Sequence, residues 1–219
     1  YGGSALNPIN ALAKILGDLT DDQGRIQLPG FYDGIPERTM EQMAEWDALG
    51  FDEAAFLADI GLSSPSGEAQ RGGLERLWAR PTADINGIWG GYQGPGSKTV
   101  IASEAYAKVS FRLVTGQDQD QVVRAFQQFC DERAPAGAKV EVSDLHGAPA
   151  MEVPLDLPQL RAARSALAEE YGRPPVNVGS GGSIPVVEKM KRILGLDSVL
   201  MGFGLNDDQI HSPNEKFEQ

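Results

Sequence analysis

The sequence predicts a chain of two parts: an α+β domain, built from an antiparallel sheet with helices on one face, followed by an incomplete α/β segment. Three observations predict this fold class. Apolar and polar side chains alternate between residues 84 and 114, which is typical of a half-exposed sheet. A helical period at about 118–132 separates this stretch from a further strand-like one. Beyond about residue 149, helical and strand-like segments alternate, as in an α/β sheet.

Helices are expected at three places in the first 60 residues. Asn7 is a predicted N-cap, with Pro8 at the first position of its helix. Thr39 and Gln42 form a capping-box pattern for a second helix. A third, shorter helix is expected at about 52–60, before a Gly- and Ser-rich stretch that predicts a surface loop.

The sheet is expected because side chains of alternate residues have opposite character. One face would hold Val109, Phe111 and Leu113, and the other Lys108, Ser110 and Arg112. After the helix at about 118–132, residues 139–145 predict another strand of this sheet. The composition then becomes rich in proline and the period changes, so a domain boundary is expected near residue 148.

The second part begins with a helix expected at 158–171. A short strand at 176–178, a glycine loop at 179–183, a helix at 184–194 and a buried apolar run at 198–204 should follow. The roughly 70 residues in this part are too few for a complete doubly wound domain.

The composition disfavours some classes of partner. The 19 Lys and Arg are outnumbered by 31 Asp and Glu, which gives a formal net charge of −12 and argues against nucleic acid and anionic membranes as partners. No stretch approaches the roughly 18 apolar residues that span a bilayer. Cys130 is the only cysteine, and it is expected to be a packed thiol, with a nucleophile as the alternative. A single cysteine suits a reducing compartment without proving one. A cytoplasmic location is predicted.

His211 is the first candidate for chemistry, because the chain has only two histidines. Ser212 and Glu215 fit a capping box, so His211 should immediately precede a helix. A neutral imidazole after a buried strand suits a metal ligand or a general base, and a solvated loop histidine is the alternative. Asp207 and Asp208 either orient the ring or are simply solvated.

A second candidate is a site for an anion. The loop "GSGGSIP" (179–185), with Ser183 as the expected N-cap, offers free backbone N–H groups to a carboxylate, although a plain tight turn also explains it. Arg112 can bind a carboxylate through two parallel hydrogen bonds, or it is an ordinary surface arginine. Thr99 and Lys98, in "GPGSKTVI", either reach a ligand or belong to a hairpin edge.

Several ordered motifs together suggest a family. The segments "YGG…NP", "IQLPGFYDGIPE", "INGIWGGYQGPGSKTVI", "KVSFRLV", "GSGGSIPVVE" and "GFGLNDDQIHSPNEKF" resemble the dinuclear-zinc hydrolases that include carnosine dipeptidase, acetylornithine deacetylase and succinyl-diaminopimelate desuccinylase. The resemblance is closest to the cytosolic dipeptidase branch. It covers essentially all 219 residues.

The resemblance implies a two-domain enzyme. Residues 1–148 would be the lid and dimerisation domain, and residues 149–219 the C-terminal part of the zinc-peptidase catalytic domain. His211 would be a zinc ligand, and Thr99 would reach the substrate region, across a homodimer formed by the lid. The residues that bind the terminal carboxylate of the substrate would be Arg112, Gly181, Gly182 and Ser183.

The resemblance also implies a reaction. Dipeptides with a free carboxylate would be hydrolysed by a water activated between two divalent ions, expected to be zinc, with Mn or Co as alternatives. The general-base glutamate and the other ligands are expected upstream of Tyr1, so the chain alone is predicted to be inactive. The alternatives are a non-catalytic dimerisation or amino-acid-binding module and an amidohydrolase acting on N-acyl amino acids.

Overall fold

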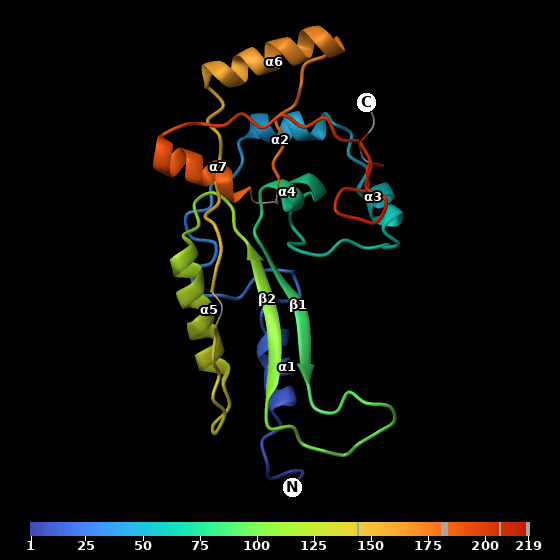
Figure 1. The fold of residues 1–219 in the computed structure, drawn as a ribbon, viewed down its shortest axis with the longest axis vertical. Coiled ribbons are helices and arrows are strands. Elements are labelled where there is room, and N and C mark those ends of the chain that lie inside the picture. Colours follow the sequence, from blue (N-terminus) through green and yellow to red (C-terminus); the bar gives the residue numbers. More distant parts are fainter. Residues whose placement is uncertain (144, 181–183, 206, 218–219) are drawn as a thin grey trace. The chain divides into compact units, whose positions relative to one another are not determined.

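A computed structural model describes residues 1–143, 145–180, 184–205 and 207–217 (Figure 1). The helices are α1 (Pro8–Gly17), α2 (Met40–Asp47), α3 (Glu53–Asp59), α4 (Gly73–Trp78), α5 (Gln119–Arg133), α6 (Pro158–Tyr171), α7 (Pro185–Lys189) and the π-helical η1 (Met190–Leu194). The strands are β1 (Thr82–Gly90) and β2 (Ala105–Arg112). The chain divides into two compact units: Tyr1–Glu152 with Val176–Glu188, and Val153–Pro175 with Lys189–Gln219.

Side-chain caps explain where α1 and α2 begin, as predicted. The Asn7 side chain accepts hydrogen bonds from the N–H groups of Ile9 and Asn10, at 3.0 and 3.4 Å. At α2 the capping box is complete, because Thr39 accepts from the Gln42 N–H and the Gln42 side chain accepts from the Thr39 N–H. These bonds satisfy backbone donors that have no partner inside a helix.

The short helix α4 was not predicted from the sequence. Its six residues have no side-chain cap, so neither a cap nor a full apolar period marks it. Packing stabilises it instead: the indole of Trp78 meets that of Trp46 from α2 edge-on, with ring centroids 5.3 Å apart.

The sheet described by the structure is an antiparallel hairpin of β1 and β2 (Figure 1). Its register pairs Thr82 with Arg112 and Trp89 with Tyr106, with an irregularity between Ile85 and Gly87. Along β2, half-buried and exposed residues alternate, which confirms the predicted period of two.

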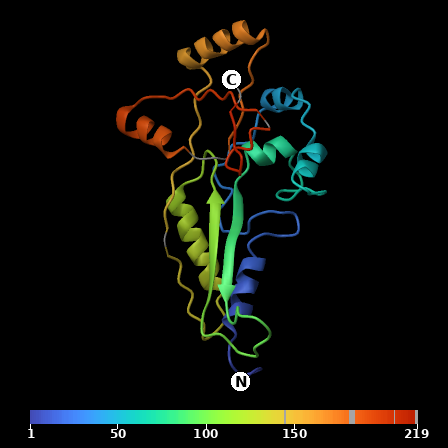
Figure 2. The same ribbon diagram turned by 45° about the vertical axis from the view of Figure 1, so that its right-hand side comes forward.

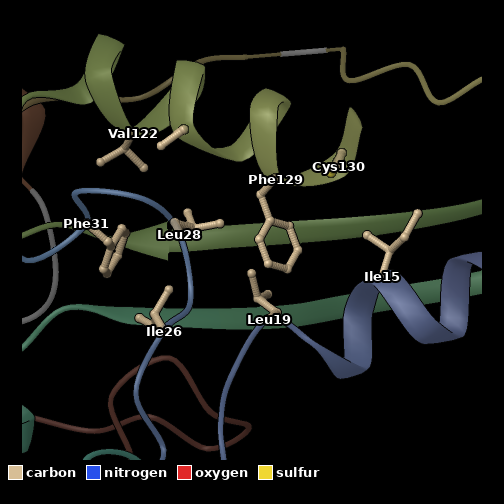
Figure 3. Close-up of a cluster of buried hydrophobic side chains, with 9 residues drawn as sticks. Ile15, Leu19, Ile26, Leu28, Phe31, Val122, Phe129 and Cys130 are labelled. Carbon is tan, nitrogen blue, oxygen red and sulfur yellow. The ribbon is translucent and has the colours of Figure 1, made fainter. Parts of the chain in front are cut away.

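The core lies between this hairpin and the helices α1 and α5. Figures 1 and 2 show α5 lying along the hairpin, and Figure 3 shows its side chains pointing toward the strands. Phe129 of α5 is fully buried, and Leu19, just after α1, is 2% exposed. The cluster consists of Ile15, Leu19, Ile26, Leu28, Phe31, Val122, Ala125, Phe129 and Cys130. A sheet with helices packed on one face confirms the predicted α+β fold.

Two predicted strands are not formed by the residues that the structure describes. Residues 139–143 keep the expected alternation, and Val140 and Val142 pack against the core, but this segment has no strand pairing. Residues 176–178 are likewise irregular. A strand needs a hydrogen-bonded neighbour, and periodicity in the sequence does not tell whether one is available.

The helices of the second part agree better with the sequence. Helix α6 has the predicted bounds, and α7 with η1 fills the predicted helix at 184–194. The apolar run at 198–204 was predicted to be buried, which is wrong for this chain: Leu200 is 58% exposed and Phe203 is 52% exposed. Among the described residues of this run no strand forms, so no sheet covers these side chains.

Candidate functional site

Arg112 is the last residue of β2 and lies on the exposed face of the hairpin. Its register partner is Thr82, whose hydroxyl donates to Asp84 Oδ2 at 2.9 Å. Within the described part of the chain, the Arg112 guanidinium forms no ion pair. It therefore keeps its donors available for an anion from outside the hairpin.

Thr99 is exposed in the loop that joins β1 to β2. Two contacts shape this loop: the Tyr92 hydroxyl donates to the Pro95 carbonyl at 2.9 Å, and the Lys98 ammonium lies 5.7 Å from the centre of the Tyr92 ring. At its base, the rings of Trp89 and Tyr106 stack at 5.3 Å. The loop presents Thr99 to solvent.

One hairpin holds Arg112 and Thr99 at opposite ends. Arg112 ends β2, whereas Thr99 precedes the start of β2 at Ala105. Ala105 and Arg112 are seven residues apart along β2, which corresponds to a distance of about 23 Å along the strand. In Figure 1 the loop lies at the end of the hairpin away from the β2 arrowhead. A single copy therefore does not bring both side chains to one dipeptide-sized ligand.

The predicted glycine loop is described only in part, because Gly181, Gly182 and Ser183 lie outside the described residues. Gly179 is described, and a Cβ at this position would lie 2.5 Å from the Trp78 Cβ and 2.6 Å from the Trp78 carbonyl oxygen. The glycine is thus required for close packing against α4. This role differs from the ligand approach that the sequence suggested for the loop.

His211 lies in a series of turns, with a left-handed φ of 64°. Its N–H donates to Glu215 Oε2 at 2.9 Å. The prediction of a capped helix here is wrong for the described residues 207–217, which contain only turns and irregular backbone. Glu215 does reach back along the chain as expected, but it caps His211 and not Ser212.

The loop around His211 is closed by bonds at its base. The Lys216 N–H donates to the Asp208 carbonyl at 3.0 Å, and the Lys216 ammonium lies 2.9 Å from Asp207 Oδ2. The hydrogen bond from Lys216 lowers the pKa of Asp207. Asp208 is only 2% exposed, and its Oδ2 accepts from the Leu205 N–H at 2.7 Å. The two neighbouring aspartates thus have different surroundings.

A complete metal site is not formed by the described residues, which contain no group of three or more His, Cys, Asp and Glu side chains placed around one point. The exposed His211 ring is suited to supply one ligand. It does not supply the rest of a coordination shell.

A buried ion pair in the first unit had no signal in the sequence. Arg80 donates to both carboxylate oxygens of Glu68, at 2.7 and 2.8 Å, and both residues are at most 6% exposed. Arg25 and Arg71 also approach this carboxylate, at 3.4 and 3.9 Å. Tyr32 lies under Arg25, and burial is the main cause of its raised pKa. The Glu68 carboxylate is thus surrounded by internal partners, so the pair is structural.

No helix in the described ranges is long and apolar enough to cross a membrane.

The family model for the M20 "Peptidase dimerisation domain" matches residues 1–138. The chain is 30% identical to human Beta-Ala-His dipeptidase, covering 100% of this chain and 44% of that protein. It is 28% identical to the Saccharomyces cerevisiae Cys-Gly metallodipeptidase DUG1, covering 100% of this chain and 46% of that protein.

A solved structure of human carnosine dipeptidase 1 superposes with a TM-score of 0.82, at 28% identity, over 98% of this chain and 46% of that one. The chain therefore spans less than half the length of the relatives that it matches.

Proposed function

Because this chain belongs to the M20 peptidase dimerisation domain family, we propose that it is the lid and C-terminal part of a metal-dependent dipeptidase. The reaction is hydrolysis of a dipeptide with a free terminal carboxylate. Relatives named as dipeptidases match the chain over its whole length, which supports this activity.

Arg112 is proposed to bind the terminal carboxylate of the substrate, together with Gly181, Gly182 and Ser183. The observation that carries this proposal is the exposed guanidinium at the end of β2, without an ion pair among the described residues. An arginine binds a carboxylate through two parallel hydrogen bonds, which fixes both its position and its orientation.

His211 is proposed to be a ligand of one of two divalent ions, with zinc as the expected metal. Such ions, when bound, polarise a carbonyl and acidify a water. His211 itself contributes a neutral nitrogen at a fixed place, because Glu215 holds its N–H and the loop is closed at Asp208 and Lys216. The general-base glutamate is proposed to come from outside this chain.

A homodimer is proposed, in which Thr99 of one copy reaches the substrate region of the other. The separation of Thr99 from Arg112 along the hairpin supports this arrangement, because one copy does not offer both to one small substrate. The family description as a dimerisation domain supports it independently.

The proposed domains are residues 1–148 for the lid and residues 149–219 for the catalytic part. Large exposed apolar side chains in the second segment support its incompleteness: Ile193, Leu194, Leu196, Leu200 and Phe203 are 52 to 66% exposed. An apolar surface of this kind is normally covered by protein.

The cytoplasmic location stays a prediction, which fractionation of the source cells tests.

Kinetics of the longer protein that contains this chain test the proposal. Arg112→Ala is expected to lower kcat/KM for a dipeptide by about 10- to 100-fold, because a charge-assisted hydrogen bond is lost. The matched control is Lys108→Ala, on the same exposed face of β2, which should leave kcat/KM within about twofold.

A dipeptide whose carboxylate is converted to an amide distinguishes binding from misfolding. Its hydrolysis should be slow both with the unsubstituted protein and with the Arg112→Ala variant, with little difference between the two. Faster hydrolysis of N-acyl amino acids than of dipeptides would point to an amidohydrolase instead. Absence of metal-dependent hydrolysis of both substrate classes would contradict the proposed function.

A further inference from the structure

The loop at residues 207–216 contains a buried carboxylate oxygen that has no partner among the described residues. Asp208 is 2% exposed, and its Oδ2 accepts from the Leu205 N–H at 2.7 Å. Its Oδ1 is buried and accepts no hydrogen bond from the described part of the chain. A buried carboxylate oxygen without a donor is unfavourable, so a donor is expected to reach it in the working protein.

The other two carboxylates of the loop are already used. Asp207 is 71% exposed and pairs with the Lys216 ammonium at 2.9 Å. Glu215 accepts from the His211 backbone N–H at 2.9 Å. Only Asp208, among these three, combines burial with an oxygen that lacks a described donor.

The side chains that follow Asp208 and carry an N–H donor include the amide of Gln209 and the imidazole of His211, one and three residues further on. The bond between the Ser212 N–H and the Gln209 carbonyl, at 2.8 Å, and the bond from Lys216 to the Asp208 carbonyl fold this segment into a closed loop. Histidines that bind a metal through one nitrogen almost always donate the other N–H to a carboxylate, a carbonyl or water, which fixes the ring and its tautomer.

We propose that Asp208 is a positioning residue for His211: its free Oδ1 accepts a hydrogen bond from the imidazole N–H that faces away from the metal. This inference rests on the proposed function, because it takes His211 to be a ligand. Asp208 therefore has two tasks. Oδ2 holds the backbone of Leu205, and Oδ1 orients the ring.

The test uses the longer protein with its metal and three variants: His211→Ala, Asp208→Asn and Asp207→Asn. Metal affinity is measured by competition with a chromogenic chelator. Asp208→Asn keeps an oxygen for Leu205 but replaces the acceptor for the imidazole, so it should weaken metal binding by about 10- to 100-fold. Asp207→Asn, the matched control on the exposed neighbour, should change metal affinity by less than about twofold.

A second measurement separates orientation of the ring from general stability. In the Co²⁺-loaded protein, the imidazole N–H of a bound histidine gives a shifted proton resonance, and the one that disappears in His211→Ala belongs to His211. This resonance should be protected from exchange with water in the unsubstituted protein and in Asp207→Asn, and should exchange rapidly in Asp208→Asn.

The outcomes distinguish the inference from the proposed function. If His211→Ala leaves metal affinity unchanged, His211 is not a ligand, and both the metal site and this inference are wrong. If His211→Ala weakens metal binding but Asp208→Asn leaves affinity and the resonance unchanged, only the inference is wrong. If Asp208→Asn does not fold, the test is hydrogen exchange of the His211 imidazole N–H in the unsubstituted protein. Rapid exchange with water overturns the inference, and protection from exchange supports it.

Discussion

Cys130 is a residue whose surroundings decide its reactivity. It is 4% exposed on the inner side of α5, and burial, with a smaller contribution from the Asp131 charge, raises the pKa of its thiol to about 11. Only the thiolate reacts readily with electrophiles. The folded chain is therefore expected to resist a thiol-specific reagent at pH 8 and to react after denaturation, which a spectrophotometric titration measures. Complete labelling of the folded chain within minutes would contradict this.

The same thiol predicts a change of stability with pH. An unfolded cysteine ionises from about pH 9, whereas the folded one stays protonated until about pH 11, so the unfolded state loses protons first. The free energy of unfolding should therefore fall as the pH rises from about 9 to about 11, by up to about 2–3 kcal/mol from this group. Denaturant unfolding of Cys130→Ala over the same pH range is the control, and the two pH profiles should differ in slope only above pH 9.

Gly116 and Gly137 provide a matched pair for backbone strain. Both have left-handed φ angles, 95° and 88°, but a Cβ at Gly116 would overlap with the carbonyl of Gly34, whereas a Cβ at Gly137 would meet nothing within 4 Å. Gly137→Ala should cost about 1–2 kcal/mol. Gly116→Ala should cost at least about 2 kcal/mol more, because the loops must move apart. Equal Tm values for the two variants would contradict this explanation.

Some residues could not be predicted from the sequence because their roles depend on contacts between distant segments. Asp207 and Asp208 are adjacent and chemically identical, yet one is exposed and paired with Lys216 and the other is buried. Arg112 was easier to place, because strand alternation alone puts it on the exposed face. Alternation predicts the face of a side chain but not the partner that it meets.

At the scale of elements, the sequence predicted helices well because their signals are local. The caps at Asn7, Thr39 and Asp118 bind N–H groups within three residues. A strand at 139–145 was predicted from an equally clear alternation, but the described residues 139–143 form none, because pairing requires a neighbour that the local pattern does not specify. Helix α4 was missed because tertiary packing stabilises it.

The Glu68–Arg80 pair connects the loop before α4 to the segment that leads into β1, and it should be important for stability. Arg80 is only 6% exposed, so Glu68→Gln leaves its guanidinium buried without an opposite charge. This variant is expected to lower the free energy of unfolding by about 3–5 kcal/mol. Glu141→Gln, in a pair with Lys139 whose side chains are 72 and 86% exposed, is the control and should cost less than about 0.5 kcal/mol.

A double variant tests the cause. Replacing both partners, as Glu68→Leu with Arg80→Met, removes the buried guanidinium together with its carboxylate and should cost less than Glu68→Gln alone. Of the other two arginines near Glu68, Arg71 keeps its pairs with Glu37 and Glu75, and the Arg25 side chain is 48% exposed to water. If the double variant is less stable than the single one, the bond geometry itself, and not the unpaired charge, supplies the stability.

At the scale of the whole molecule, the first unit has a dense core and many internal ion pairs, whereas the second exposes much of its apolar surface. The α+β fold of the first unit was therefore predictable from the periodicity of its own sequence. The second segment was predictable as helices but not as a buried sheet, because its apolar run has no covering partner among the described residues. The resemblance of ordered motifs, and not the fold pattern, identified the family.

The isolated 219-residue chain is predicted to have no detectable dipeptidase activity. A pair of cocatalytic ions needs several ligands each, and the described part of the chain offers no group of three donors around one point. The measurement is hydrolysis of a dipeptide panel with Zn²⁺, Mn²⁺ or Co²⁺, by the isolated chain and by the longer protein at equal molarity. Protection of Cys130 shows that the first unit of the isolated chain is folded, so that inactivity is not due to misfolding of that unit. Robust hydrolysis by the isolated chain, abolished by His211→Ala, would show that this chain forms a working metal site by itself.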